Sequence, residues 1–215
     1  MHRDRMIYQT DETRSCILAM AQRLFLENGL VATQMQDIAR ELKISRTSLY
    51  RYYQNKFELA TEILSNLSRD MATNWDEVME HTVPKANGLA EVEFYLYEFW
   101  ISDRFKVAHE YMAEYDAFFS GERADETVLK GIARYYTNYS MELLTALIKR
   151  GINDASIRPD LDVHLSAVTL VNAVRSLQQR LIMRGRVLIE ARSDEHPKMM
   201  TELLRYLVLG ISARA

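Results

Sequence analysis

One short stretch of the sequence, residues 46–52, carries side chains suited to contact with a polyanion. It offers two guanidinium groups, two hydroxyls and two phenols, and the next acid is Glu58. The side chains are those of Arg46, Thr47, Ser48, Tyr50, Arg51 and Tyr52. Arginine can bond guanine bidentately, serine and threonine can bond base edges or phosphates, and tyrosine hydroxyls commonly reach phosphate oxygens. This composition indicates a surface that binds nucleic acid.

Two short helices and a turn are expected to position this stretch. The apolar spacing predicts helices over about 34–42 and 46–53, joined by a turn at Lys43-Ile44, with Ser45 capping the second helix. Two short helices joined in this way form a helix-turn-helix, whose second helix enters the major groove of DNA. The stretch at 46–52 would then be the reading helix.

The neighbouring segments fit the same arrangement. A helix over about 11–27 should end at Gly29, which suits the left-handed position after a helix. Thr33 is expected to cap the following helix and to form a capping box with Gln36. Lys56 stands at the start of a fourth helix that runs to about residue 80, where its ammonium group and the exposed backbone N–H groups could hold a phosphate.

The charge of the chain is unevenly distributed. Residues 1–56 contain nine Lys and Arg against six Asp and Glu, whereas the whole chain has 27 against 30. A basic N-terminal quarter on an acidic body suits a DNA-binding protein, because neutralisation of phosphates supplies most of the non-specific affinity. The surplus is small and carries little weight alone.

Composition places the chain in the all-α class and argues against several kinds of enzyme. Apolar residues make up 48%, with only 7 Gly and 3 Pro, and helical spacing recurs almost throughout. The single cysteine, Cys16, excludes an internal disulfide and a Cys-based zinc site. No glutamate has a histidine three residues later, and no Gly-rich phosphate loop, His-Glu-x-x-His or Ser-His-Asp order is present. We therefore expect neither catalysis nor a cofactor. A module that keeps the fold without binding DNA remains a rival.

The sequence also suggests where the protein works and how it is divided. Its polar N-terminus has no apolar stretch that could serve as a signal peptide, and no apolar run reaches the roughly 18 residues of a membrane span. A cytoplasmic protein is expected. The predicted domains are a DNA-binding domain at 1–56 and a helical domain at 57–215, with the clearest linker at 82–88.

The stretch from Thr13 to Leu59 resembles the DNA-binding domain of the tetracycline-repressor (TetR) family. The matching motifs are Thr13-Arg14-x-x-Ile17-Leu18, Leu24-Phe25-x-x-x-Gly29, Ala32-Thr33, Asp37-Ile38-Ala39, Ile44-Ser45 and Ser48-Leu49-Tyr50-x-Tyr52-Tyr53-x-x-Lys56-x-x-Leu59. Two positions depart from the family pattern. Lys43 stands where a small residue is usual, which predicts a slightly strained turn, and Arg51 stands where histidine is frequent.

The resemblance implies a two-fold dimer that binds a palindromic operator and a C-terminal helical domain that binds a small molecule and releases the DNA. It also implies which residues contact DNA. These are Thr33, Gln34 and Gln36 from the first short helix, Arg46, Thr47, Ser48, Tyr50, Arg51 and Tyr52 from the second, and Lys56 as a phosphate contact.

Aromatic residues crowd the region from Phe94 to Tyr139 and could line the effector pocket. Ligand pockets are mostly apolar with a few polar groups, and phenols, an indole and nearby carboxylates suit an aromatic or cationic effector. The candidate ligand contacts are Tyr97, Trp100, Tyr111, Tyr115 and Tyr139. Core packing is the alternative for each of them. His109 and Glu110, with Glu114 and Asp116, are expected to be surface charges rather than a metal cluster.

The last two helices carry more apolar residues than one core face needs. In the helix expected around 196–212, Tyr206 and Leu209 widen the apolar arc formed by residues such as Leu203 and Leu207, so this helix needs partners on two sides. The helix over 161–184 is also apolar, with small residues that permit close approach. We expect the two helices to form a four-helix interface in a homodimer. Burial of both within a monomer's core is the alternative.

Overall fold

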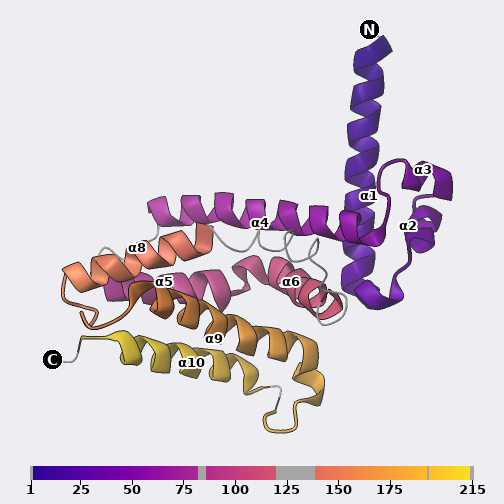
Figure 1. The fold of residues 1–215 in the computed structure, drawn as a ribbon. Helices are drawn as coiled ribbons and strands as arrows, with labels where there is room; N and C mark the ends of the chain where they lie inside the picture. The colour runs from indigo at the N-terminus through magenta and orange to yellow at the C-terminus, as the bar shows by residue number, and fades with distance from the viewer. Residues whose placement is uncertain (1, 82–85, 120–138, 193, 214–215) are drawn as a thin grey trace. The chain divides into compact units, whose positions relative to one another are not determined.

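A computed structural model describes residues 2–81, 86–119, 139–192 and 194–213, and these residues form an all-α fold, as predicted (Figure 1). Within these ranges the β-type pairing is a single isolated bridge between Ile157 and Ser212. The helices are α1 (His2–Ala32), α2 (Met35–Glu41), α3 (Arg46–Tyr50), α4 (Lys56–His81), α5 (Gly88–Trp100), α6 (Lys106–Phe118), α8 (Tyr139–Asn153), α9 (Val163–Arg184) and α10 (His196–Ile211), with short 3-10 turns at Asp103–Phe105 and Gly185–Val187.

The chain forms two compact units, and each is described by itself. The first unit comprises Met1–Arg69 and Tyr111–Ile132, and the second comprises Asp70–Glu110 and Ala133–Ala215. Helices α4 and α6 each run from one unit into the other. The predicted boundary between functional domains, at residue 56, stays a prediction.

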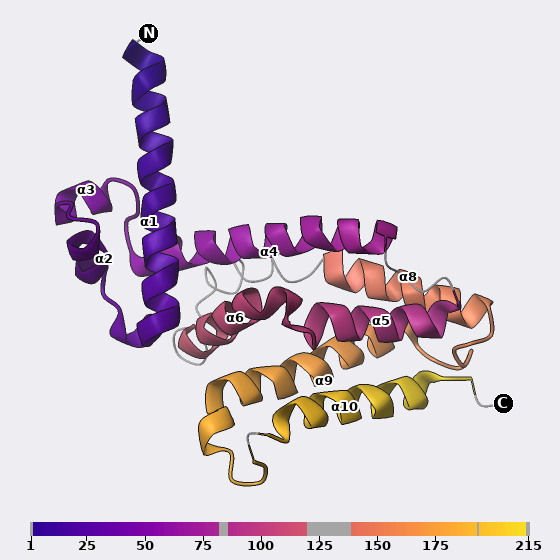
Figure 2. The ribbon, with the colours of Figure 1, turned by 180° about the vertical axis from the view of Figure 1, so that it is seen from behind.

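In the first unit, α2 contacts both α1 and α3, and the two short helices lie beside α1 (Figures 1 and 2). Ile17, Ile38 and Leu49, one from each of these helices, are fully buried. Helix α1 begins at His2, earlier than the expected start near residue 11. Its regular path breaks at Gly29, where φ is 82° and ψ is 155°, a conformation that is strained for any residue with a Cβ. The break lies where the sequence predicts the helix end.

In the second unit, α5 packs against α8, α9 and α10. Its buried face joins an aromatic cluster in which the ring of Trp75 meets those of Tyr95 and Phe99 edge-on, at centroid distances of 5.3 and 5.5 Å. Helices α9 and α10 contact each other and lie side by side in both views (Figures 1 and 2). The second unit is therefore a helical bundle with a largely aromatic core.

The start of α5 crosses α8 at unusually close range. A Cβ on Gly88 would lie 2.2 Å from the backbone nitrogen of Gly151, so only glycine allows the two backbones to approach in this way. The carboxylate of Asp154 accepts a hydrogen bond from the N–H of Gly88 at 2.6 Å. This crossing sets where α5 begins. Helix α5 ends at Trp100 and α6 begins at Lys106, with a short 3-10 turn at Asp103–Phe105 between them.

Two negative findings apply to the ranges given above. None of their helices is both long and apolar enough to cross a membrane. No three His, Cys, Asp or Glu side chains in them come together as a possible metal site.

Candidate functional site

Helix α2 precedes α3, the helix that the sequence identifies as the DNA-reading helix. The N-terminal cap of α2 is Gln34, whose backbone N–H donates to the carboxylate of Asp37 at 2.9 Å. The capping box predicted for Thr33 and Gln36 is therefore wrong by one residue. The hydroxyl of Thr33 donates instead to the carbonyls of Gly29 and Leu24, because the end of α1 offers it acceptors inside the core.

The turn between α2 and α3 has the strain that the sequence predicts. Lys43 adopts a left-handed conformation with φ 55°, and the N–H of Ile44 reaches back to the carbonyl of Ala39 at 3.0 Å. Ser45 caps α3 as expected, since its hydroxyl accepts from the N–H of Ser48 at 3.0 Å. These bonds fix the direction in which α3 leaves the turn.

Helix α3 is shorter than predicted and shows most of its side chains to solvent. It ends at Tyr50 rather than Tyr53, because the fully buried ring of Tyr53 belongs to the core. Within α3 only Leu49 is buried. Of the ten predicted DNA contacts, those exposed are Gln34, Gln36, Arg46, Thr47, Tyr50 and Arg51, those half-buried are Ser48, Tyr52 and Lys56, and the one buried is Thr33.

The positive charges on this surface are only partly neutralised. The guanidinium group of Arg46 donates to the side-chain oxygen of Gln36, which ties α3 to α2 without cancelling the charge. The guanidinium group of Arg51 makes no hydrogen bond or ion pair within the described ranges, whereas Arg40 is paired with Asp37 at 2.8 Å. Two uncompensated guanidinium groups therefore stand beside the exposed phenol of Tyr50, which is the arrangement that contact with phosphates and base edges requires.

Two predicted contacts have structural roles in this arrangement. Thr33 is 3% exposed, so its side chain does not reach a ligand on the outside of the first unit. The ammonium group of Lys56 donates to the carbonyls of Leu30 and Thr33, at 2.5 and 2.8 Å, and lies over the ring of Phe118 at 4.7 Å. Lys56 therefore fastens the start of α4 to the end of α1.

Two residues at this site were not expected from the sequence. Lys43 is exposed beside α3 and adds a cation to the same surface, whereas the sequence pattern predicts only the strain of its backbone. Glu114, expected to be a surface charge, accepts from the N–H of Leu30 at 3.3 Å. Its position on α6, 84 residues along the chain, leaves no local signal for that contact.

The profile described as "Bacterial regulatory proteins, tetR family" matches residues 17–63, which span α1 to α4 and include the whole helix-turn-helix. Residues 17–63 therefore match the DNA-binding segment of the tetR family. The chain is a transcriptional regulator and not an enzyme.

The curated relatives are named as HTH-type transcriptional regulators. The "Uncharacterized HTH-type transcriptional regulator YhgD" of Bacillus subtilis (strain 168) is 24% identical over 208 residues, 94% of this chain and 98% of the relative. The "HTH-type transcriptional repressor KstR2" of Rhodococcus jostii (strain RHA1) is 28% identical over 153 residues, 71% and 72% of the two chains. The solved structure of the regulator FadR from Bacillus subtilis in complex with stearoyl-CoA shares the fold, with a TM-score of 0.69, 16% identity and coverage of 92% and 98%.

The predicted ligand contacts whose side chains are described belong to two different units. Tyr111 and Tyr115 are fully buried in the first unit, where their hydroxyls bond to the carbonyl of Ala60 at 2.9 Å and the hydroxyl of Thr61 at 2.8 Å. Trp100 is buried in the second unit. Tyr139 is outside the set of side chains that the structure describes. Trp100, Tyr111 and Tyr115 are thus part of the buried cores, and their role as ligand contacts stays a prediction.

His109 is buried rather than a surface charge. Its ring stacks on that of Trp100, with centroids 5.2 Å apart and an interplanar angle of 11°, and its Nδ1 lies 3.0 Å from the amide nitrogen of Gln178. Burial, reinforced by the nearby positive charge of Arg175, lowers the pKa of His109 to about 4. The imidazole is therefore neutral at physiological pH.

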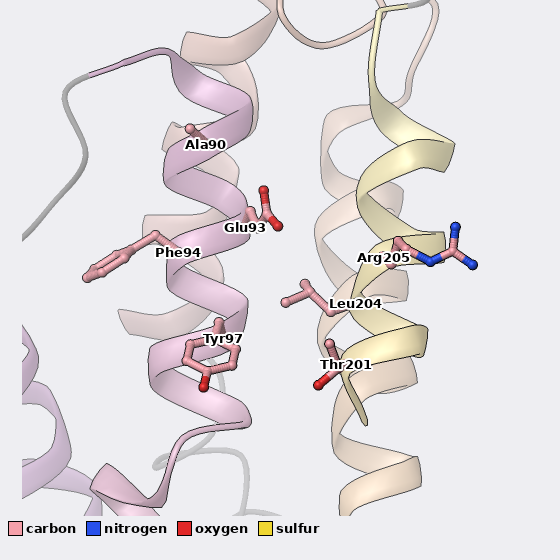
Figure 3. Close-up of a pocket in the computed structure, with 7 residues that line it drawn as sticks. All are labelled: Ala90, Glu93, Phe94, Tyr97, Thr201, Leu204 and Arg205. Carbon is pink, nitrogen blue, oxygen red and sulfur yellow. The ribbon is translucent and has the colours of Figure 1, made fainter. Parts of the chain in front are cut away.

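A pocket of about 560 Å³ lies between α5 and α10 in the second unit (Figure 3). Tyr97 is the one predicted ligand contact that lines it. Glu93 is one of the carboxylates that the sequence places near the aromatic candidates, and Ala90, Glu93, Phe94 and Tyr97 follow the i, i+3, i+4, i+7 spacing of one helix face. The full lining consists of Ala90, Glu93, Phe94, Tyr97, Thr201, Leu204 and Arg205.

Proposed function

We propose that this chain is a TetR-family repressor that binds a palindromic operator as a two-fold dimer and releases it when a small molecule binds the domain at 57–215. The observation that carries this is the exposed surface of α3, where Arg46, Tyr50 and Arg51 surround a single buried anchor, Leu49. If α3 served only to stabilise the fold, the aromatic ring of Tyr50 would be expected to pack in the core. A protein with this role works in the cytoplasm, where its operator is.

The side chains of α3 would divide the work of recognition. Arg46 lies at the N-terminal end of the helix, the part that contacts base edges in a helix-turn-helix, and can bond a guanine bidentately. Arg51 and Lys43 follow and precede the helix and suit phosphates, which position the protein without reading sequence. Thr47 and Tyr50 lie between them.

A dimer through α9 and α10 would supply the second reading helix. Five apolar side chains on these helices are exposed by more than a third: Leu165, Ile182, Met183, Tyr206 and Leu209. Other residues of both helices, such as Ala167 and Leu204, are buried within the unit, so each helix is apolar on two sides. Association of two copies through the exposed sides would place the reading helices about 34–36 Å apart, or a multiple of that distance.

Release would be carried by the helices that run from one unit into the other. Helix α4 starts at Lys56, whose ammonium group donates to the carbonyls of Leu30 and Thr33 at the end of α1. Helix α6 contributes Glu114, bonded to Leu30, and Tyr115, bonded to Thr61. An effector that displaces either helix changes the separation of the reading helices, and a preference of a few kcal/mol for the non-binding spacing is sufficient. The effector we propose is aromatic or cationic.

Selection of bound sequences from a pool of random duplexes tests the proposal. A repressor of this kind enriches a palindrome whose half-sites are about one helical turn apart. An enriched sequence without two-fold symmetry would contradict the dimer, and no enrichment would favour an interaction module that keeps the fold without binding DNA. The Leu165→Glu/Tyr206→Glu double variant serves as a check on the dimer, because charges on the exposed faces should yield monomers that bind the operator weakly.

A further inference from the structure

We infer that the groove between α5 and α10 binds a small organic cation with a flat apolar body. Its volume of about 560 Å³ lies within the range of small-molecule sites, roughly 300–1,000 Å³. Both walls belong to the second unit. The binding chemistry stands on the groove itself, whereas a role as the effector site rests on the proposed function.

The charge that a ligand meets in the groove is negative. In Figure 3 the carboxylate of Glu93 extends from α5 on the side of α10, and no hydrogen bond or ion pair holds it within the described part of the chain. The one cation in the lining, Arg205, is occupied elsewhere. Its guanidinium group donates twice to Glu202, at 2.7 and 3.0 Å, lies over the ring of Tyr206 and points away from α5 in the same view.

The apolar part of the groove lies next to this carboxylate. Leu204 points from α10 toward α5 and is buried, and the ring of Tyr97 stands one helical turn from Glu93 with 44% of its surface exposed (Figure 3). A cation over a phenol ring gains electrostatic attraction from the ring quadrupole, about 0.5–1 kcal/mol at exposed sites. Glu93 would attract the charge, Tyr97 would offer its ring and Leu204 would contact the apolar body.

A small molecule suits the groove better than a second copy of the chain. The apolar side chains proposed for the dimer, among them Leu165, Tyr206 and Leu209, are not in the lining. The lining itself presents one unpaired acid and no unpaired base, so two identical grooves facing each other would place like charges together.

Calorimetric titration with benzyltrimethylammonium tests the inference, with benzylphosphonate and benzyl alcohol as the anionic and neutral probes of similar shape. We expect the cation to bind and the other two to bind at least about fivefold more weakly. Glu93→Gln should weaken binding of the cation about fivefold, since it removes the charge and keeps the shape, and Tyr97→Leu should weaken it about threefold. Glu142→Gln, an exposed acid on α8, is the matched control and should leave the affinity unchanged.

Equal binding of the three probes, or unchanged affinity in Glu93→Gln, would overturn the inference. So would an affinity for the cation that falls as protein concentration rises, because a second copy would then occupy the groove. Operator affinity is measured separately with a fluorescent duplex. If the cation binds through Glu93 while the chain binds no duplex, the groove stands and the proposed function fails. If the chain binds its duplex and no probe binds, the proposed function stands and the inference about the groove fails.

Discussion

The carboxylate of Glu114 accepts a hydrogen bond from the N–H of Leu30, 3.3 Å away, directly after the left-handed Gly29. This contact joins α6 to the point where α1 ends and the helix-turn-helix begins. An element that starts in the second unit thus reaches the segment that aims α2 and α3. The relationship makes Glu114 a positioning residue for the DNA-reading surface.

Replacing Glu114 tests that role. Glu114→Ala should lower the free energy of unfolding by about 1 kcal/mol, because the N–H of Leu30 loses its acceptor in a half-buried place. Glu114→Gln keeps a side-chain oxygen and should stay near the wild-type value. Chemical denaturation of both variants gives the comparison, and equal losses in the two would show that the charge rather than the acceptor matters.

Lys56 gives a prediction that separates two roles. The sequence predicts a phosphate contact, whereas the structure shows its ammonium group bonded to the carbonyls of Leu30 and Thr33. Lys56→Met should therefore cost about 1–3 kcal/mol of folding free energy, since two carbonyls lose a charged donor. A pure phosphate contact would leave stability unchanged and reduce the salt dependence of operator binding by about one charge. Denaturation and a salt titration of operator affinity distinguish the two.

The non-glycine residues with left-handed backbone in the described ranges are Lys43 and Ala155, and both predict stabilising glycine substitutions. Their φ angles are 55° and 61°, where a Cβ costs roughly 1–2 kcal/mol and the entropy of glycine in the unfolded chain offsets part of the gain. Lys43→Gly and Ala155→Gly should each raise the free energy of unfolding by about 0.5 kcal/mol. Only Lys43→Gly should also weaken operator binding, because it removes an exposed cation. A loss of stability in Ala155→Gly would contradict the strain.

Stability should depend on pH through His109. Its pKa is lowered to about 4 in the folded chain, against about 6.5 for an unperturbed histidine. Above pH 6.5 both states are neutral and the full stability is present. Between pH 6.5 and 4 the unfolded chain takes up a proton that the folded chain does not, so stability falls by up to roughly 3 kcal/mol. The difference between wild type and His109→Gln, measured by denaturation across this window, should follow that course, and a constant difference would contradict it.

Local sequence signals predicted the helix-turn-helix because its decisive contacts are local. Ser45 caps the helix that begins one residue later, and the strain at Lys43 arises within its own residue. The capping box was wrong by one residue because Thr33 finds acceptors at Leu24 and Gly29 inside the core. The local sequence around a threonine that precedes a helix is the same whether its hydroxyl caps that helix or bonds to carbonyls in the core.

The candidate ligand site was harder to predict because exposure depends on distant neighbours. Tyr97 and Tyr111 both lie on apolar helices, yet Tyr97 is 44% exposed and Tyr111 is fully buried. The hydroxyl of Tyr111 bonds to the carbonyl of Ala60, 51 residues away in the chain. The groove also needs α10, whose Leu204 and Arg205 come more than 100 residues after Tyr97. Helical spacing alone cannot sort such residues into core and lining.

Whether α3 reads DNA is tested by the affinity of the chain for its selected duplex, measured by fluorescence anisotropy over a range of salt concentrations. Binding should weaken steeply with salt, and Arg46→Ala should lose at least about fivefold in affinity, since a bidentate base contact is worth about 1–3 kcal/mol. Arg192→Ala, which removes an exposed arginine of the second unit, should bind as the wild type does. Binding that ignores salt, or equal affinity of the two arginine variants, would contradict the claim that α3 reads DNA.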